Sequence, residues 1–208
     1  MYELYWGKNS AALAPEAVLE EAGLPYEKVL IDFKRKETRS PDYLAINPAG
    51  YLPALITPEG DILYESATIV LYLCDRHQLD LAPRPGERER GLFYRSLFYM
   101  TNTVQEAYKL YYYPERYAGD GADLQATCVQ ALALLLERWA VVDRALAAAG
   151  PFLLGERFSA ADIYLAMLVT WHPEEAEFLA RFAGIKRCFE AACARPIFGR
   201  VIAAHRAD

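Results

Sequence analysis

Cysteine and histidine are scarce in this sequence, which narrows the chemistry available to the chain. Only four cysteines and three histidines occur in 208 residues, and no CxxC pair is present. Neither a metal site nor a dithiol redox motif is therefore expected. We interpret the cysteines as reduced, mostly buried thiols. They are Cys74, Cys128, Cys188 and Cys193.

Basic charge, long apolar runs and targeting signals are also lacking. The 22 Lys and Arg residues are outnumbered by 28 Asp and Glu residues, which gives a net charge of −6 and argues against nucleic acid as a partner. No apolar run approaches the roughly 18 residues of a membrane helix. The opening MYELYWGKNS lacks the basic and apolar regions of a secretory signal. We therefore expect a cytoplasmic protein without a membrane segment.

The first 80 residues alternate between strand-like and helix-like patterns. The predicted strands are 2–6, 26–33, 52–57 and 62–64, and the predicted helices are 12–22, 40–46 and 65–77. Turn sequences separate them, notably Asn47-Pro48-Ala49-Gly50. The resulting order, βαβαββα, predicts an α/β domain in which a parallel βαβ unit continues into a hairpin and a closing helix.

The remainder of the chain is different in character. A segment rich in proline and glycine, 79–87, is a predicted linker. Beyond it we find no convincing strand pattern, and helices are predicted at 91–112, 124–149, 159–171, 174–182, 186–194 and 196–205. The sequence therefore predicts two domains, an α/β domain at 1–78 and an all-α helical bundle at 88–208.

Two motifs of the first domain suit ligand binding as well as folding. Pro53 heads a predicted strand, where a residue without an N–H is normally unfavourable. A cis Leu52–Pro53 bond would turn the backbone of Leu52 outward, free to pair with a ligand peptide; the alternative is a plain edge proline. Glu65 and Ser66 follow at the start of a predicted helix, where they can cap the helix or bind the charged groups of a ligand.

A third motif lies in the second domain. Phe158-Ser159-Ala160-Ala161-Asp162-Ile163-Tyr164 places an acid three residues after a serine, a variant of the capping box that starts a helix. Read together, the three motifs resemble the glutathione transferase superfamily over essentially the whole chain. The stretches LYWGKNSAALAP and DYLAINPAGYLPAL are similar to its bacterial beta-type branch.

The resemblance implies a thioredoxin-like first domain that binds glutathione as co-substrate, with no metal. It implies that Tyr51, Leu52 and Pro53 hold the cysteinyl part of glutathione through the backbone. Glu65 would pair with the ammonium of the γ-glutamyl end. Ser66 and the helix N–H groups would donate to its α-carboxylate. The basic run 34–36 would border the glycine carboxylate.

The residue that activates the thiol is less evident. Glutathione transfer requires a thiolate at neutral pH, although free thiols titrate near pKa 8.5. Ala11 stands where the beta-type cysteine would be. Three neighbours can replace it, in order of preference Ser10, Asn9 and Tyr5. Each also has a possible structural role, because Ser10 can cap the helix, Asn9 can stabilise a turn, and Tyr5 can pack in the sheet.

The resemblance also implies an acceptor site between the domains, against the predicted helix 91–112. Asn102, Gln105 and Tyr108 are its expected lining, although aromatic residues at helical spacing also suit core packing. The function implied is a glutathione S-transferase that conjugates glutathione to small hydrophobic electrophiles, as in detoxification, and that forms a homodimer. The alternative is a non-catalytic binding or regulatory relative.

Overall fold

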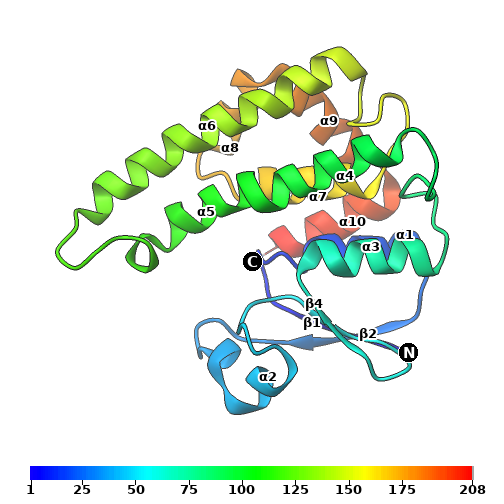
Figure 1. Cartoon of the computed structure of the whole chain (residues 1–208), viewed down its shortest axis with the longest axis horizontal. Coiled ribbons are helices and arrows are strands. Elements are labelled where there is room, and N and C mark those ends of the chain that lie inside the picture. Colours follow the sequence, from blue (N-terminus) through cyan, green and yellow to red (C-terminus); the bar gives the residue numbers. More distant parts are fainter. Residues whose placement is uncertain (208) are drawn as a thin grey trace. The chain divides into compact units, whose positions relative to one another are not determined.

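The computed structural model describes residues 1–207, and the chain divides into two compact units. The sheet unit comprises residues 1–87 together with the segment from residue 192 onward, and the helical unit comprises residues 88–191. We expected the second domain to extend to the C-terminus. Instead the last helix, α10 (Pro196–Arg206), packs on α1 (Leu13–Glu21) in the sheet unit (Figure 1).

The sheet confirms the predicted βαβαββα order. Its strands lie in the order β2 (Tyr26–Leu30), β1 (Tyr2–Trp6), β3 (Ala54–Ile56) and β4 (Ile62–Tyr64). β1 runs parallel to β2 and antiparallel to β3, and β3 runs antiparallel to β4. β2 and β3 are shorter than predicted, and the residues left over before β3 include Leu52 and Pro53, two of the predicted ligand contacts.

Local chemistry accounts for the start of α2 and the end of α1 in the sheet unit. α2 (Pro41–Ile46) has proline in its first turn, and the Tyr43 N–H donates to the Ser40 hydroxyl, 3.2 Å away. Gly23, with φ +61°, ends α1 as predicted. α3 (Ser66–Arg76) packs against α1. The core is therefore built from α1, α3, α10 and the face of β1 that carries Leu4.

The helical unit consists of helices joined by turns and loops. The α-helices are α4 (Arg90–Tyr99), α5 (Gln105–Tyr112), α6 (Leu124–Ala149), α7 (Ala160–Val169), α8 (Glu175–Arg181) and α9 (Ala183–Cys193), the last ending at the boundary with the sheet unit. The predicted helix 91–112 is interrupted by a π-helical segment, η2 (Met100–Val104). The capping box predicted for α7 is present, since the Asp162 carboxylate accepts from the Ser159 N–H at 2.8 Å. Every residue of α7 is buried.

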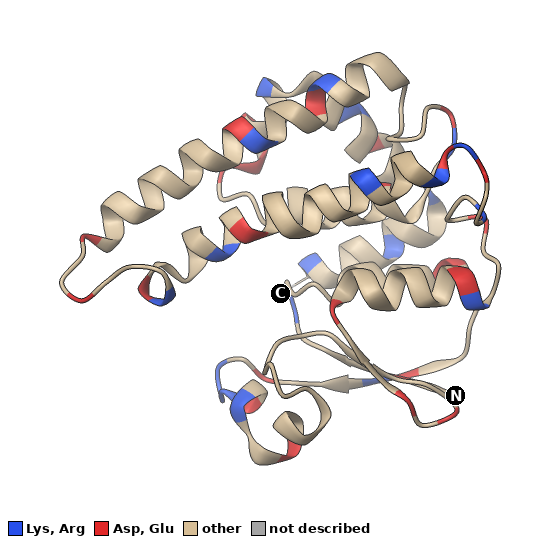
Figure 2. Ribbon diagram, in the orientation of Figure 1, with Lys and Arg blue, Asp and Glu red and all other residues tan. Residues whose placement is uncertain are grey.

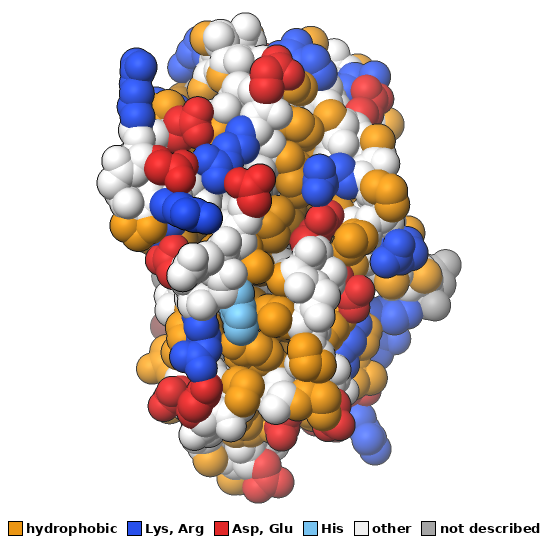
Figure 3. All heavy atoms as spheres, turned by 90° about the vertical axis from the view of Figure 1, so that its right-hand side faces the viewer, with side chains coloured by type: hydrophobic (Ala, Val, Ile, Leu, Met, Phe, Trp, Pro, Cys, Tyr) orange, Lys and Arg blue, Asp and Glu red, His pale blue; other side chains and the backbone are white. Residues whose placement is uncertain are grey.

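The surface carries both signs of charge. Acidic and basic residues are scattered over both units (Figure 2), and on the face drawn in Figure 3 they are interspersed with apolar side chains. Within residues 1–207, none of the helices combines the length and hydropathy needed to cross a bilayer. All four cysteines are thiols rather than disulfides, two of them fully buried.

Candidate functional site

The loop between β1 and α1 holds two of the three candidate thiol-activating residues. The Ser10 hydroxyl donates to the Gly7 carbonyl, 2.7 Å away, and accepts from the Ala12 N–H at 3.2 Å. A hydroxyl has one proton to donate, and here the carbonyl of Gly7 takes it. Ser10 therefore closes the turn that leads into α1, and it could donate to a ligand only by releasing Gly7.

Asn9 and Tyr5 differ in whether their side chains are free to donate a hydrogen bond to a ligand. Asn9 is exposed, has a left-handed φ of +53°, and its amide makes no hydrogen bond to the residues that the structure describes. Tyr5 packs against Tyr43 of α2 with ring centroids 6.0 Å apart. Burial raises the pKa of the Tyr5 hydroxyl, and the nearby Glu3 carboxylate raises it further. Asn9 is thus the one of the three with a free donor.

The start of α3 is tied directly to this loop. The Ser66 hydroxyl donates to the Ala11 carbonyl, 2.7 Å away and buried. We expected that hydroxyl to serve a ligand, but its proton is used within the fold. The first intrahelical bond of α3 runs from the Ile69 N–H to the Glu65 carbonyl, so the N–H groups of the first turn remain to bind an anion.

Glu65 precedes α3 in an unusual backbone conformation. Its φ of +68° is rare for a residue with a side chain. Such conformations are found at functional sites more often than elsewhere. The side chain is exposed, and within residues 1–207 its carboxylate has no ion pair or hydrogen bond. A negative charge is therefore available immediately beside the N–H groups of α3.

The Leu52–Pro53 peptide bond is cis, which is one of the two alternatives that the sequence left open for Pro53. The preceding carbonyl, that of Tyr51, accepts from the Tyr43 hydroxyl at 2.6 Å and from the Asn47 amide at 2.7 Å. In contrast, neither the N–H nor the carbonyl of Leu52 has a hydrogen-bond partner among the described residues. The fold therefore holds the loop firmly on one side of Leu52 and leaves the backbone of Leu52 itself available.

The Leu52 loop adjoins the β1–α1 loop. A Cβ placed on Gly7 would lie 3.0 Å from the Leu52 Cδ1 and 2.7 Å from a ring carbon of Phe33, so a larger residue there would require Phe33 or Leu52 to shift. Gly7 in turn accepts from Ser10, and Ala11 accepts from Ser66. Loops that are distant in sequence are thus joined by contacts into one polar cluster, in which Asn9, Leu52 and Glu65 have unused hydrogen-bonding groups.

Sequence reasoning missed two residues that shape this cluster. Asn47 is buried, and its amide bridges the Tyr51 carbonyl and the Ala49 N–H. Arg39 donates to the Ala49 carbonyl at 3.3 Å and lies 5.6 Å from the ring of Tyr51. Basic residues gather in the segment that leads into α2 (Figure 2), and of these Arg39 contacts the loop. Only the turn pattern around Asn47 could have indicated its role.

The residues expected to line an acceptor site are mostly used within the helical unit. Tyr108 is 1% exposed, and its hydroxyl accepts from the Trp139 indole at 3.2 Å. Gln105 accepts from the Tyr164 hydroxyl at 2.5 Å. Asn102, in the π-helical segment η2, is exposed and accepts from the Thr101 hydroxyl at 3.1 Å. Tyr108 is therefore a core residue, Gln105 is half-buried, and Asn102 is exposed.

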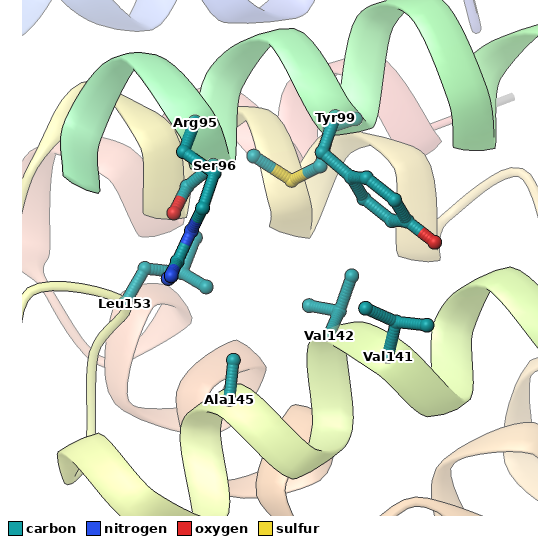
Figure 4. Close-up of a pocket in the computed structure, with 8 residues that line it drawn as sticks. Arg95, Ser96, Tyr99, Val141, Val142, Ala145 and Leu153 are labelled. Carbon is teal, nitrogen blue, oxygen red and sulfur yellow. The ribbon is translucent and has the colours of Figure 1, made fainter. Parts of the chain in front are cut away.

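A cavity of about 170 Å³ lies elsewhere in the helical unit, between α4 and α6. Arg95 and Tyr99 extend from α4 toward Val142 and Ala145 of α6 (Figure 4). None of the expected acceptor residues lines it. Within residues 1–207, no group of three or more His, Cys, Asp or Glu side chains is arranged to hold a metal ion.

Comparison with known proteins identifies relatives over most of the chain. Residues 2–75 match the model for the glutathione S-transferase N-terminal domain. Glutathione S-transferase 3 of Zea mays is 30% identical over 197 residues, 90% of this chain and 86% of that protein. The uncharacterised GST-like protein YncG of Escherichia coli is 29% identical and covers 97% of each chain.

Solved structures of glutathione transferases are also similar to this chain. A glutathione transferase homologue from Sulfitobacter, crystallised with bound glutathione, superposes with a TM-score of 0.90 at 27% identity and covers 98% of each chain. A glutathione transferase from Methylococcus capsulatus has a TM-score of 0.85 at 30% identity, with 99% of each chain covered.

Proposed function

This chain belongs to the glutathione S-transferase family, and from that premise we propose that it binds glutathione and transfers its thiolate to small hydrophobic electrophiles. The observation that carries the proposal is the polar cluster of the sheet unit. There the backbone of Leu52, the carboxylate of Glu65 and the first N–H groups of α3 have no partners among the described residues. The Sulfitobacter homologue, which binds glutathione, supports it.

Each unused group suits one part of glutathione. The backbone of Leu52 would pair with the cysteinyl residue as an added strand does, with Tyr51 and Pro53 fixing the loop. The carboxylate of Glu65 would bind the γ-glutamyl ammonium. The N–H groups at the start of α3 would bind the adjacent α-carboxylate, while Ser66 keeps the Ala11 carbonyl in place. Two opposite charges of the ligand would thus be matched side by side.

We propose that Asn9 stabilises the thiolate, ahead of Ser10 and Tyr5. A donor directed at the sulfur lowers the pKa of the thiol because it favours the charged form. The amide of Asn9 is exposed and unused, whereas the proton of Ser10 is held by Gly7. The raised pKa of Tyr5 keeps its phenol protonated and able to donate at neutral pH. Its packing against Tyr43, however, favours a structural role.

A second function is favoured by the same loop. Ala11 supplies no side-chain donor, and the hydroxyl of Ser10 is already used. Without a donor at the sulfur, the cluster would hold glutathione but leave its thiol unactivated. The chain would then be a glutathione-binding or regulatory protein that catalyses no conjugation.

One experiment separates these functions. Glutathione is titrated into the protein by calorimetry, and the thiolate absorbance of the complex is followed against pH. Transferase function requires binding at millimolar glutathione and a bound thiol with a pKa well below the free value of about 8.5. Binding with an unshifted pKa supports the non-catalytic function, and the absence of binding contradicts both.

Two substitutions then assign the donor. Asn9→Ala should raise the pKa of the bound thiol, and Ser10→Ala should change it less. Gln78→Ala is the matched control, because Gln78 is another exposed amide in the sheet unit with a left-handed φ, +50°. An unchanged thiol pKa in Asn9→Ala would eliminate that residue as the donor.

Further attributes concern the acceptor site, the oligomeric state, the location and the branch of the family. Asn102 is proposed to contact the electrophile, because it is exposed on a π-helical segment and such segments are frequent at functional sites. We further propose a cytoplasmic homodimer with a detoxification role, nearest to the bacterial beta-type branch. Analytical ultracentrifugation at micromolar concentration tests the dimer, and a monomeric mass would contradict it.

A further inference from the structure

A buried charged network lies in the sheet unit outside the cluster described above. Glu16 of α1 is 5% exposed. One of its carboxylate oxygens lies 2.9 Å from the His205 Nε2 of α10, and the other lies 2.6 Å from the Lys28 Nζ of β2. Burial raises the pKa of Glu16, but the hydrogen bonds from His205 and Lys28 outweigh burial and lower it overall. The carboxylate is therefore charged and fully paired.

This network attaches α10 to α1 along its length. At the other end of α10, the Arg195 guanidinium lies 3.1 Å from the Glu21 carboxylate. A carboxylate only accepts hydrogen bonds, so the His205 Nε2 must carry the proton that faces Glu16. The His205 Nδ1 is buried without a partner among the described residues. The imidazole is thus held by one hydrogen bond, and its orientation depends on Glu16.

The end of α10 also reaches the β1–α1 loop. The ring of Trp6, the last residue of β1, meets the His205 ring edge-on with centroids 5.4 Å apart. Two residues later, the Lys8 ammonium donates to the Ala207 carbonyl at 2.8 Å. Trp6 and Lys8 stand on either side of Gly7, the residue whose carbonyl holds Ser10.

We propose that the C-terminal end of α10 positions the loop that activates the glutathione thiol, with His205 acting through Trp6 and the Ala207 carbonyl acting through Lys8. The inference rests on the proposed function, because it extends the thiol-activating site. The loop carries Asn9 and Ser10 immediately after the two contacts. A helix almost 200 residues away in sequence thus sets the direction in which the donor points. His205 and Lys8 are positioning residues and do not contact glutathione.

The test uses the full chain, three variants and a control. Lys8→Met removes the exposed contact, which contributes little to stability. His205→Leu removes the bond to Glu16, and His205→Gln retains an N–H donor. Arg200→Ala is the control, since Arg200 is an exposed cation of α10 whose guanidinium, within residues 1–207, has a hydrogen bond only to the Pro196 carbonyl of the same helix. Two quantities are measured, the hydrogen exchange of amides 7–12 without glutathione and the pKa of the bound thiol.

We expect amides 7–12 to exchange about fivefold faster in Lys8→Met and in His205→Leu, because each loses one restraint on the loop. The pKa of the bound thiol should rise toward its free value in both variants, while His205→Gln restores most of the wild-type behaviour. Arg200→Ala should match the wild type in both measurements.

If Lys8→Met and His205→Leu both leave the hydrogen exchange and the thiol pKa unchanged, the proposal is overturned. A lower urea midpoint in His205→Leu would then indicate that His205 is purely structural. If His205→Leu does not fold, Lys8→Met decides by itself. Failure of the wild type to bind glutathione would refute the proposed function instead. In that case the hydrogen exchange, measured without ligand, still decides whether α10 positions the loop.

Discussion

The two units of this transferase relative differ in what their polar groups do. In the sheet unit, the backbone of Leu52 and the carboxylate of Glu65 are left without partners among the described residues. In the helical unit, Gln105, Tyr108 and Asp162 are bonded to other residues of the same unit. Groups that are exposed and unsatisfied are suited to ligands, whereas buried and satisfied groups stabilise the fold.

The difference shows that a polar residue on a plausible face is not evidence of a binding site. Tyr108 and Gln105 have the spacing of a pocket lining, yet both bond within the helical bundle. Glu65 and Leu52 were predicted from short motifs, and their unused groups are consistent with binding. Substitution of buried, hydrogen-bonded groups such as Asp162 should therefore change stability, and substitution of the unused groups of the sheet unit should change glutathione affinity.

The largest expected effect is on the helical unit, from Asp162→Ala. The buried carboxylate accepts from the N–H groups of Leu153 and Ser159, each at 2.8 Å. Its loss leaves these donors unsatisfied and should lower the free energy of unfolding by about 3 kcal/mol. Urea unfolding measures this loss. Asp120→Ala, in an exposed loop of the same unit, is the control, and equal midpoints for the two variants would contradict the assignment.

The same carboxyl makes the stability of the wild type depend on pH. Burial raises the pKa of Asp162 to about 6, against an ordinary value of 3.8 in the unfolded chain. Between these values the folded state binds more protons than the unfolded state. The protonated carboxyl therefore stabilises the fold fully below the unfolded pKa, and this stabilisation is lost as pH rises through about 6. The stability difference between wild type and Asp162→Asn should shrink from pH ~4 to pH ~7. A difference that is constant with pH would refute this.

A comparable test of the sheet unit is Glu65→Gln. It removes the charge proposed to bind the ammonium of glutathione and should raise the dissociation constant about tenfold or more. Stability should be unchanged, because the carboxylate is exposed and has no partner among the described residues. Calorimetry supplies the constant. Glu27→Gln makes the same change of charge on β2, and similar affinities for both variants would argue against a direct contact.

The smallest expected effect is that of Tyr43→Phe. The hydroxyl of Tyr43 is one of two donors to the Tyr51 carbonyl, and burial raises its pKa to about 12, so it remains a donor at neutral pH. Its loss should cost about 1 kcal/mol of stability and weaken glutathione binding less than Glu65→Gln does. Tyr64→Phe, on an exposed tyrosine of β4, should have no effect on either quantity. If Tyr43→Phe behaves in the same way, the Tyr43 hydroxyl does not contribute to holding the loop.

The sequence by itself determined the features that depend on nearby residues. The βαβαββα order, the Ser40 cap, the end of α1 at Gly23 and the capping box of α7 all follow from contacts spanning a few residues. The immediate context of Pro53 left a cis bond and a plain edge proline open, and the bond is cis. Such local interactions are the same wherever the segment is placed, which is why patterns of spacing reveal them.

Only the tertiary structure decided which of the candidate groups remain free. The bond from Ser66 to Ala11 joins residues 55 apart, and that from His205 to Glu16 joins residues 189 apart. No local pattern encodes these pairs, because they depend on how the helices pack against the sheet. The same packing assigned α10 to the sheet unit and buried Tyr108. A hydroxyl has one proton to donate, and the folded chain determines whether a neighbour or a ligand receives it.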